Sequence, residues 1–235
     1  TDGLSGLIGL ERSLTPAVTV DARIGYAWWE SAPGQLLVRG GVEASLSTGT
    51  SLALGVEHGG FLDWSDAFEA VYAGIDATSL RGTVWQGITE AWGAFGYAEG
   101  TFVSDGNRRI ALGASTDYRP LRDFELLLGL GVDYVTYTAR SPLYYDPDTD
   151  VSAAALIRFD QPLAEWLVLF GEGNCGVGFA EQAGLEGFGI NYGVSGGLRI
   201  TRGGLKLSVQ GGRSQSQRAI VYTSYTFGGA LEVAF

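Results

Sequence analysis

Hydrophobic and polar residues alternate one by one over residues 219–235, at the end of the chain. Every second position there is mostly apolar or aromatic: Val221, Thr223, Tyr225, Phe227, Gly229, Leu231, Val233 and Phe235. The positions between them carry small or polar side chains. Because successive side chains of a β-strand point to opposite faces, this pattern predicts a strand with one apolar face. Such a strand is also typical of a soluble sandwich, so the rest of the chain decides between the two.

The same period of two recurs from Ala17 onward and predicts twelve strands. Their ranges are 17–29, 36–47, 51–57, 66–78, 90–103, 109–118, 124–137, 151–159, 166–178, 188–201, 205–214 and 219–235. Residues 1–16 are expected to form a lead-in segment or an extra strand, ahead of a single barrel domain over residues 17–235. Segment 79–89 shows no clear period and is expected to be a long loop or a short inward-folded segment.

Spanning strands account for this composition better than a soluble sandwich does. The chain has 37 glycines and 17% charged residues, and it has no apolar run long enough for a spanning helix. Without such a helix, only a closed barrel pairs every backbone group inside a bilayer. The polar side of the strands carries Gly, Ser, Thr and charges of both signs, whereas the outer face of a soluble protein is usually rich in Lys and Glu. Lys206 is the only lysine.

The predicted fold is therefore all-β, a transmembrane antiparallel up-and-down β-barrel of the bacterial outer membrane. We expect about twelve strands, with fourteen or more as the alternative. Longer connections near residues 33, 144 and 183 are separated by short turns, as in bacterial barrels.

Charge and residue usage disfavour several kinds of partner. The net charge of −11 argues against nucleic acid, whose phosphates need clustered Lys and Arg. A single cysteine, Cys175, excludes an internal disulfide and any multi-cysteine metal site. Its position in the alternation makes it a small lipid-facing residue. The loop Asp146–Asp150 has oxygen ligands for a weak Ca²⁺ site but lacks the rest of an EF-hand loop, so we expect it to be solvated. No metal or other cofactor is expected.

Charged and aromatic residues on the polar side of the strands form the candidate site. By strand parity the lumen receives Asp21, Glu43, Glu57, Asp76, Asp117, Asp133 and Glu172, together with Trp29, Tyr72 and Tyr137. Acidic residues that line water select which ions pass, and aromatic rings either stack on sugars or only fill the taper of a small barrel. Two alternatives stay open: a mildly electronegative channel for neutral or cationic solutes, or a plugged, salt-bridged interior.

His58, the only histidine, supports a function of another class. It lies on the predicted lipid-facing side near a strand end. There it could be the base of an outer-membrane lipid-modifying enzyme, with Ser65 and an acid such as Asp63 or Asp66. No Gly-x-Ser-x-Gly elbow supports that geometry. A histidine at the membrane rim is the simpler interpretation, so we expect no enzymatic activity and keep the enzyme as the alternative.

Short motifs in the second half of the chain resemble a known group of barrels. They are Glu90-Ala91-Trp92, Asp105-Gly106-Asn107-Arg108-Arg109, Tyr144-Tyr145-Asp146-Pro147 and Asn191-Tyr192-Gly193. Over residues 90–235 they resemble the C-terminal barrel of exopolysaccharide exporters, of the poly-N-acetylglucosamine, Pel or cellulose type, and YaiO-like outer-membrane barrels. The aromatic residue Phe235 resembles the terminal residue that serves such barrels as an assembly signal.

This resemblance implies a channel through which a polysaccharide leaves, with no chemistry in the barrel. Acidic lumens in the group go with partly deacetylated, positively charged polymers, in agreement with the net charge of −11. The implied partners are outer-membrane lipid, the polysaccharide, the barrel-assembly machinery and a periplasmic helical-repeat domain or subunit. Because the exporters have such repeats and more strands, we expect this chain to be a fragment or a smaller relative.

Overall fold

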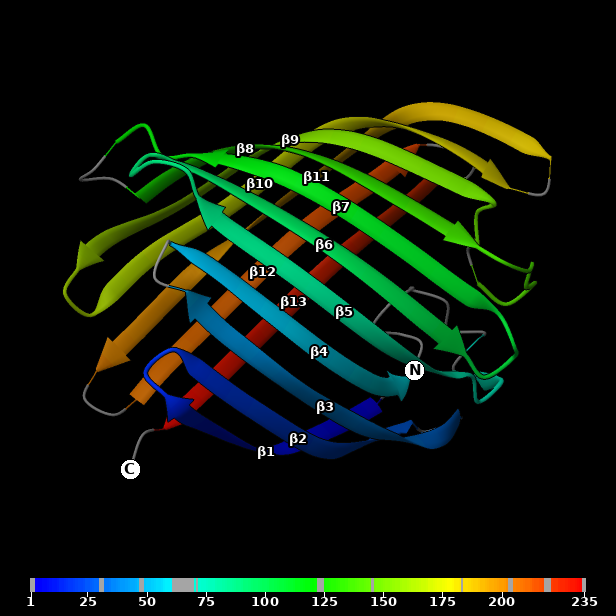
Figure 1. Ribbon diagram of the computed structural model, residues 1–235, viewed down its shortest axis with the longest axis horizontal. Helices are drawn as coiled ribbons and strands as arrows, with labels where there is room; N and C mark the ends of the chain where they lie inside the picture. The colour runs from blue at the N-terminus through cyan, green and yellow to red at the C-terminus, as the bar shows by residue number, and fades with distance from the viewer. Residues whose placement is uncertain are drawn as a thin grey trace. The chain divides into compact units, whose positions relative to one another are not determined.

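The structure is a computed structural model that describes residues 3–29, 32–46, 49–60, 70, 72–121, 125–144, 146–182, 184–202, 205–217 and 221–233. Within these residues it contains thirteen β-strands (Figure 1). They are β1 (Gly3–Thr15), β2 (Val18–Trp29), β3 (Ala32–Leu46), β4 (Thr50–Gly60), β5 (Asp76–Gly87), β6 (Trp92–Val103), β7 (Arg108–Tyr118), β8 (Glu125–Tyr137), β9 (Thr149–Ala164), β10 (Leu167–Gln182), β11 (Leu185–Arg202), β12 (Leu205–Gln217) and β13 (Val221–Val233). In this part of the chain no helix is long and apolar enough to cross a membrane.

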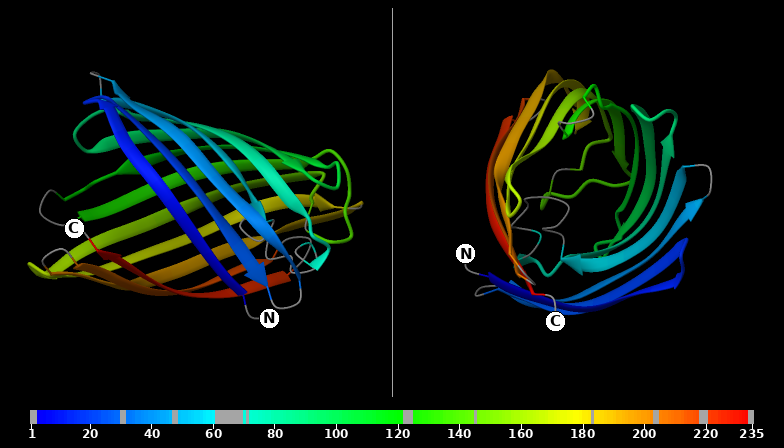
Figure 2. Two further views of the ribbon diagram at one scale, coloured as in Figure 1. Left: turned by 90° about the horizontal axis from the view of Figure 1, so that it is seen from below. Right: turned by 90° about the vertical axis from the view of Figure 1, so that its left-hand side faces the viewer.

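The described strands belong to one sheet, in which each strand is hydrogen-bonded to its neighbours in sequence (Figures 1 and 2). Successive pairs from β1 to β5, and from β10 to β13, are antiparallel. This order confirms the predicted all-β, up-and-down topology. Strand β1 is in register with β2, and β2 to β13 equal in number the twelve strands predicted from Ala17 onward. The division into domains at residue 17 stays a prediction.

The chain divides into two compact units. The first consists of residues 1–88, 94–114 and 133–150, and the second of residues 89–93, 115–132 and 151–235. The first unit therefore contains β1 to β5, most of β6, the start of β7 and the end of β8. The second contains the rest of β7 and β8 and all of β9 to β13, apart from the first two residues of β9.

Strand β4 presents one apolar and one polar face, as the alternation predicts. In β4 the side chains of Leu52, Leu54 and Val56 are exposed and define the apolar face, whereas Glu57 lies on the opposite, polar face. Phe227 of β13 is 87% exposed. Large apolar side chains are mostly buried in a water-soluble domain, so a whole face of exposed ones needs an apolar surrounding.

One predicted strand is wrong. The sequence predicts a strand over residues 66–78 and a long loop or a short inward-folded segment over 79–89, but the strand β5 runs from Asp76 to Gly87. Gly74 has a φ of 71°, and the Ile75 amide donates to the Ala70 carbonyl at 2.9 Å, which makes a turn just before the strand. The alternation of small apolar residues before Asp76 was therefore not a sign of extended backbone.

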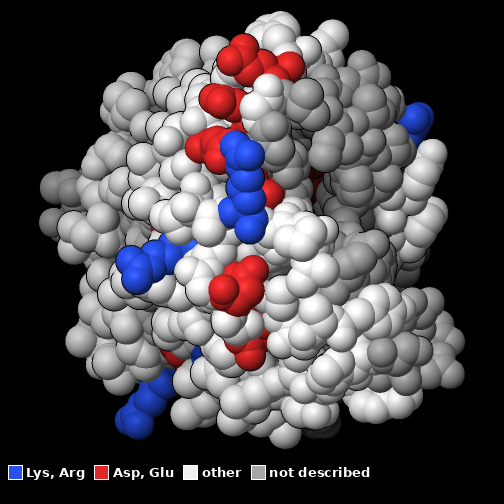
Figure 3. All heavy atoms as spheres, turned by 90° about the vertical axis from the view of Figure 1, so that its right-hand side faces the viewer, with Lys and Arg blue, Asp and Glu red and all other residues white. Residues whose placement is uncertain are grey.

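Acidic residues gather at the end of the sheet where β4 connects to β5, β6 to β7 and β8 to β9. Those connections include Asp105, Asp146 and Asp148. Figure 3 views the molecule from this end and shows several acidic side chains over it, with fewer basic ones. The β8–β9 connection, residues 138–148, is far longer than the turns at the other end, such as residues 16–17. In outer-membrane barrels the longer connections lie on the outside.

Candidate functional site

Strand register places opposite charges side by side on the polar face of the first unit. Arg39 of β3 lies opposite Glu57 of β4. On its other side Arg39 faces a like charge, Arg23 of β2. The Nη2 and Nε atoms of Arg39 are 2.6 Å and 2.7 Å from Oε1 of Glu57. Two short contacts from one guanidinium hold this carboxylate in a defined geometry. Glu57 is therefore largely compensated by Arg39.

A glycine makes room for the next acid on this face. Asp21 of β2 lies opposite Gly41 of β3, and a Cβ atom on Gly41 would stand 2.7 Å from Oδ1 of Asp21. The carboxylate of Asp21 thus occupies the space that a side chain at position 41 would fill. Arg23 Nε is 4.0 Å from Asp21 Oδ2, at the limit of an ion pair.

A denser network joins β5, β6, β7 and β8. The nearly buried carboxylate of Glu99 accepts a short hydrogen bond from Arg109, and Arg81 Nη1 lies 3.9 Å from its other oxygen. The Arg81 guanidinium also lies 4.5 Å from the centroid of the Tyr97 ring, and the Tyr97 hydroxyl donates to Asp133 at 2.8 Å. These contacts satisfy Glu99 and Asp133 inside the first unit.

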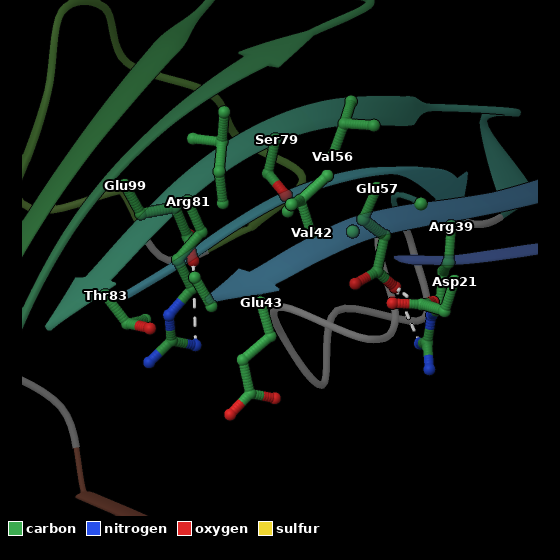
Figure 4. Close-up of a pocket in the computed structure, with 15 residues that line it drawn as sticks. Asp21, Arg39, Val42, Glu43, Val56, Glu57, Ser79, Arg81, Thr83 and Glu99 are labelled. Atoms are coloured by element: carbon green, nitrogen blue, oxygen red, sulfur yellow. Dashed lines mark hydrogen bonds and ion pairs between the residues drawn. The ribbon is translucent and has the colours of Figure 1, made fainter. Parts of the chain in front are cut away.

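A pocket of about 480 Å³ lies among these side chains (Figure 4). Its charged lining residues are Asp21, Arg39, Glu43, Glu57, Arg81 and Glu99. Figure 4 shows Glu43 extending into open space between the Arg39–Glu57 pair and the Arg81–Glu99 pair. Among the described residues Glu43 has no ion-pair partner, and its cross-strand neighbour on β4 is Ala53. The pocket therefore contains an uncompensated carboxylate.

The polar face of the second unit carries paired charges. Arg158 of β9 donates to Oε2 of Glu172 through Nη2 at 2.6 Å and Nε at 3.0 Å. Arg199 Nη1 lies 3.4 Å from Asp160 Oδ2, and its guanidinium lies 5.3 Å from the centroid of the Phe170 ring. Of the predicted acids, Glu172 is thus held in an ion pair.

A small apolar cluster covers the polar face at the long-connection end of the first unit. We call it the loop cluster; it consists of Ala70, Ile75, Ala77, Val103 and Tyr144, with Tyr137 and Leu143 packed against it. Ala77 and Val103 are polar-face positions of β5 and β6, while Tyr144 and Leu143 come from the β8–β9 connection. Tyr137, predicted to face solute in the lumen, is therefore partly covered by loop residues.

Hydrogen bonds attach the β8–β9 connection to the β6–β7 hairpin. Tyr144 donates its hydroxyl to Asp105 Oδ2 at 2.8 Å and accepts from Asn107 Nδ2 at 3.0 Å. Burial raises the pKa of the Tyr144 hydroxyl above its ordinary value, and the hydrogen bond to Asp105 raises it further. The phenol therefore stays protonated and remains a donor at neutral pH.

The structure brings together only some of the predicted site residues. Asp21, Glu43 and Glu57 meet in the pocket, and Asp133 is linked to it through Tyr97 and Arg81. Two other predicted acids belong to the second unit, Asp117 on β7 and Glu172 on β10.

Two predicted lumen residues are placed differently. Asp76 is the first residue of β5 and lies opposite Gly60 of β4. It has the same parity as Thr78, which pairs with His58 on the apolar face. The predicted parity was different because the strand was expected to begin at residue 66. Tyr72 lies outside any strand, in the turn before β5. The side chain of Trp29 and the predicted assembly signal Phe235 lie outside the described residues.

Some residues of the site were not predicted from the sequence. Arg81 belongs to the pocket, but it lies in the segment to which no period was assigned. Its alternation with Ser79 and Thr83 against Leu80 and Val84 was a usable signal. The loop cluster has no such signal, because its members come from four separate segments.

His58 makes a contact across strands on the apolar face. Its Nδ1 lies 2.9 Å from Oγ1 of Thr78, which is its cross-strand neighbour on β5. The suggested catalytic partners Ser65, Asp63 and Asp66 fall outside the described residues.

The acidic loop engages protein donors. The Asp146 carboxylate accepts a short hydrogen bond from the Ser141 amide, and Asp148 pairs with Arg140 at 2.7 Å. Over the described ranges, no group of three or more His, Cys, Asp or Glu residues could hold a metal ion.

Comparison with known proteins supports the fold. No family model and no curated protein matches the chain. One matching solved structure is a bacterial polysaccharide outer membrane secretin, with a TM-score of 0.75 and 14% identity over 99% of this chain and 80% of that chain. Another is the translocator domain of the autotransporter NalP from Neisseria meningitidis, with a TM-score of 0.49, 14% identity and the same coverage of both chains.

The likeness at a TM-score of 0.75 shows that this chain has the fold of an outer-membrane β-barrel. The predicted fold class and the predicted location in the bacterial outer membrane are thereby confirmed. In such a barrel the apolar face lies against lipid and the polar face lies inside.

Proposed function

We propose that the protein is an outer-membrane channel that passes a neutral or cationic polysaccharide along its polar face. Its fold is that of an outer-membrane β-barrel, and one protein of this fold is named a polysaccharide outer membrane secretin. The motifs that resemble exopolysaccharide exporters support the same class of solute. A periplasmic helical-repeat partner and the barrel-assembly machinery remain predicted partners.

The acidic pocket is the observation that carries this proposal. Its lining includes four carboxylates, Asp21, Glu43, Glu57 and Glu99, but only two guanidinium groups, Arg39 and Arg81. Glu57 is held by Arg39, and Glu99 by Arg109 and Arg81, whereas Glu43 has no ion-pair partner among the described residues. A wet site with an uncompensated carboxylate attracts cations and repels anions.

The proposed mechanism is passive guidance. The paired charges present hydrogen-bonding groups to sugar hydroxyls. Because these charged groups already form ion pairs with one another, each contact with the polymer is weak. Many weak contacts let a chain move without being trapped, since conduction needs sites that release as readily as they bind. The driving force comes from synthesis of the polymer on the inner side.

The test is ion selectivity and block in a planar bilayer. The reversal potential in a salt gradient should show a preference for cations, and glucosamine oligomers should block the current. Glu43→Gln should reduce both the cation preference and the block. The matched control is Glu125→Gln, which removes an exposed carboxylate at the first position of β8, away from the pocket, and should change neither.

Two results would overturn the proposal. If the wild-type pore conducts ions but is blocked by neither glucosamine oligomers nor neutral glucose oligomers, a polysaccharide is not its solute. A correctly folded wild-type protein with no conductance at all would remove the open channel.

A plugged barrel that acts through its outer loops is the second candidate. The loop cluster favours it, because Tyr144 and Leu143 cover polar-face positions at the long-connection end of the first unit. In that case conductance should be absent in the wild type and should appear when the β8–β9 connection is detached.

A further inference from the structure

An arginine lies on the apolar face of the second unit. Arg213 of β12 stands opposite Val194 of β11 and Tyr225 of β13, and these two neighbours are 60% and 65% exposed. By contrast, Arg199 lies on the polar face, where it pairs with Asp160. Arg213 is thus a cation on the lipid side of the sheet.

Two tyrosine rings position this arginine. The Arg213 guanidinium lies 5.9 Å from the ring centroid of Tyr192 on β11 and 5.7 Å from that of Tyr225 on β13. At these distances the ring faces attract a cation. Because the rings come from the strands on either side of β12, the guanidinium is held between them. Tyrosines are also the residues that gather where the bilayer meets water.

Sheet topology indicates which leaflet the arginine meets. Arg213 lies four residues before the end of β12 at Gln217, and eight residues after its start at Leu205. Strands of an up-and-down sheet alternate in direction, so β12 ends at the same end of the sheet as β8, where the long β8–β9 connection begins. That end is the outer one in barrels of this kind.

We propose that Arg213, Tyr192 and Tyr225 bind the phosphate group of an anionic lipid in the outer leaflet. The penalty for a charge on the lipid face is largest at the midplane and falls towards the headgroups. An arginine reaches the headgroups with its stem along apolar surface. Its planar fork matches a phosphate bidentately, and the tyrosine hydroxyls add donors.

A second arginine lies beside an aromatic ring on the apolar face, in the first unit. Arg108, at the first position of β7, lies 5.7 Å from the ring centroid of Phe102 on β6, and Phe102 is exposed on the apolar face. Arg108 is also at the long-connection end. Arg108 and Arg213 are thus two cations that lie beside aromatic rings on the apolar face, near the ends of their strands.

Binding of diphosphoryl lipid A to the purified protein in detergent tests the proposal. Bound lipid is counted by native mass spectrometry, and affinity is read from the rise of the thermal unfolding midpoint with lipid concentration. Arg213→Gln should weaken binding by about tenfold or more, because a charge-assisted bidentate contact is lost. Arg202→Gln is the matched control, since Arg202 is an exposed cation at the opposite end of the sheet, in register with Leu205.

Binding of lipid A without its phosphates separates recognition of the phosphate from non-specific binding of acyl chains to the apolar face. The stripped lipid should bind wild type and Arg213→Gln equally and weakly. Heat-modified gel mobility and circular dichroism show whether each variant is folded, and Arg213→Lys, which keeps the charge but not the fork, should bind at an intermediate level. Equal binding of diphosphoryl lipid A by folded wild type and Arg213→Gln would overturn the proposal, as would equally tight binding of the stripped lipid.

Discussion

Replacing Asn107 by alanine is expected to detach the β8–β9 connection, residues 138–148, from the β6–β7 hairpin. Asn107 is only 3% exposed. Its Nδ2 donates to the Ala139 carbonyl at 2.8 Å and to the Tyr144 hydroxyl at 3.0 Å. Its Oδ1 accepts from the backbone amides of Arg108 at 2.8 Å and Ala139 at 2.9 Å.

The size of the effect follows from the three of these hydrogen bonds that reach the connection, two with Ala139 and one with Tyr144. A net contribution of ~1 kcal/mol each gives about 3 kcal/mol of lost docking free energy. Since 1.4 kcal/mol corresponds to a factor of ten, the detached population should rise about a hundredfold.

Trypsin cleavage after Arg140 measures that population. Arg140 is an exposed residue within the connection, so cleavage of its peptide bond to Ser141 reports on local opening. When opening and closing are fast relative to cleavage, the cleavage rate follows the open fraction. The product is identified by mass spectrometry. Asn174→Ala, which removes an exposed asparagine from β10, is the control and should be cleaved at the wild-type rate.

An unchanged rate of cleavage after Arg140 in a folded Asn107→Ala variant would refute this reasoning. It would mean that the packing of the loop cluster, and not the asparagine, holds the connection in place. If the plugged alternative is correct, the same variant should also gain conductance in the planar bilayer.

Three further outcomes are expected. The Tyr144 hydroxyl should ionise at a pH above its ordinary pKa of 10.0, because burial raises its pKa. Its contribution to docking of the β8–β9 connection is complete below the pKa of the unfolded state and is lost as pH rises through the pKa of the folded state. The absorbance of tyrosinate, compared with that of Tyr144→Phe, measures this ionisation. Asp76→Asn should leave ion selectivity unchanged while Glu43→Gln lowers it, since Asp76 is in register with the apolar face; equal effects would contradict the register. His58→Ala should cost ~1 kcal/mol of stability through the lost Thr78 contact, seen in chemical unfolding. A lipid hydrolase activity of the wild type that this variant abolishes would instead support the enzyme alternative.

Alternation located most strands because it depends only on neighbouring residues. The run from Val221 to Val233 is a strand in the structure as in the sequence. The same signal failed before Asp76, where small apolar residues alternate but a positive φ at Gly74 and a bond from Ile75 to Ala70 make a turn. A backbone hydrogen bond within a turn does not produce a recognisable hydrophobic–polar pattern in the sequence.

The site was predictable by face but not by pairing. Glu43 and Glu57 have the same parity relative to the apolar residues of their strands, so the sequence treats them alike. Register places Arg39 beside Glu57 and Ala53 beside Glu43, so that one carboxylate is compensated and the other is not. Register depends on turn geometry and on the partner strand, which the parity of a single strand does not encode.

By itself, the sequence determined that the strands have two faces, and it predicted from the extent of the apolar face that the chain is a barrel of the outer membrane. Only the tertiary structure decided which charges meet and what covers the polar face. Asn107 and Tyr144 are 37 residues apart, yet their side chains are in contact because strand pairing places their two connections at one end of the sheet. A local period carries information over a few residues, whereas contacts at that separation arise only when the sheet has formed.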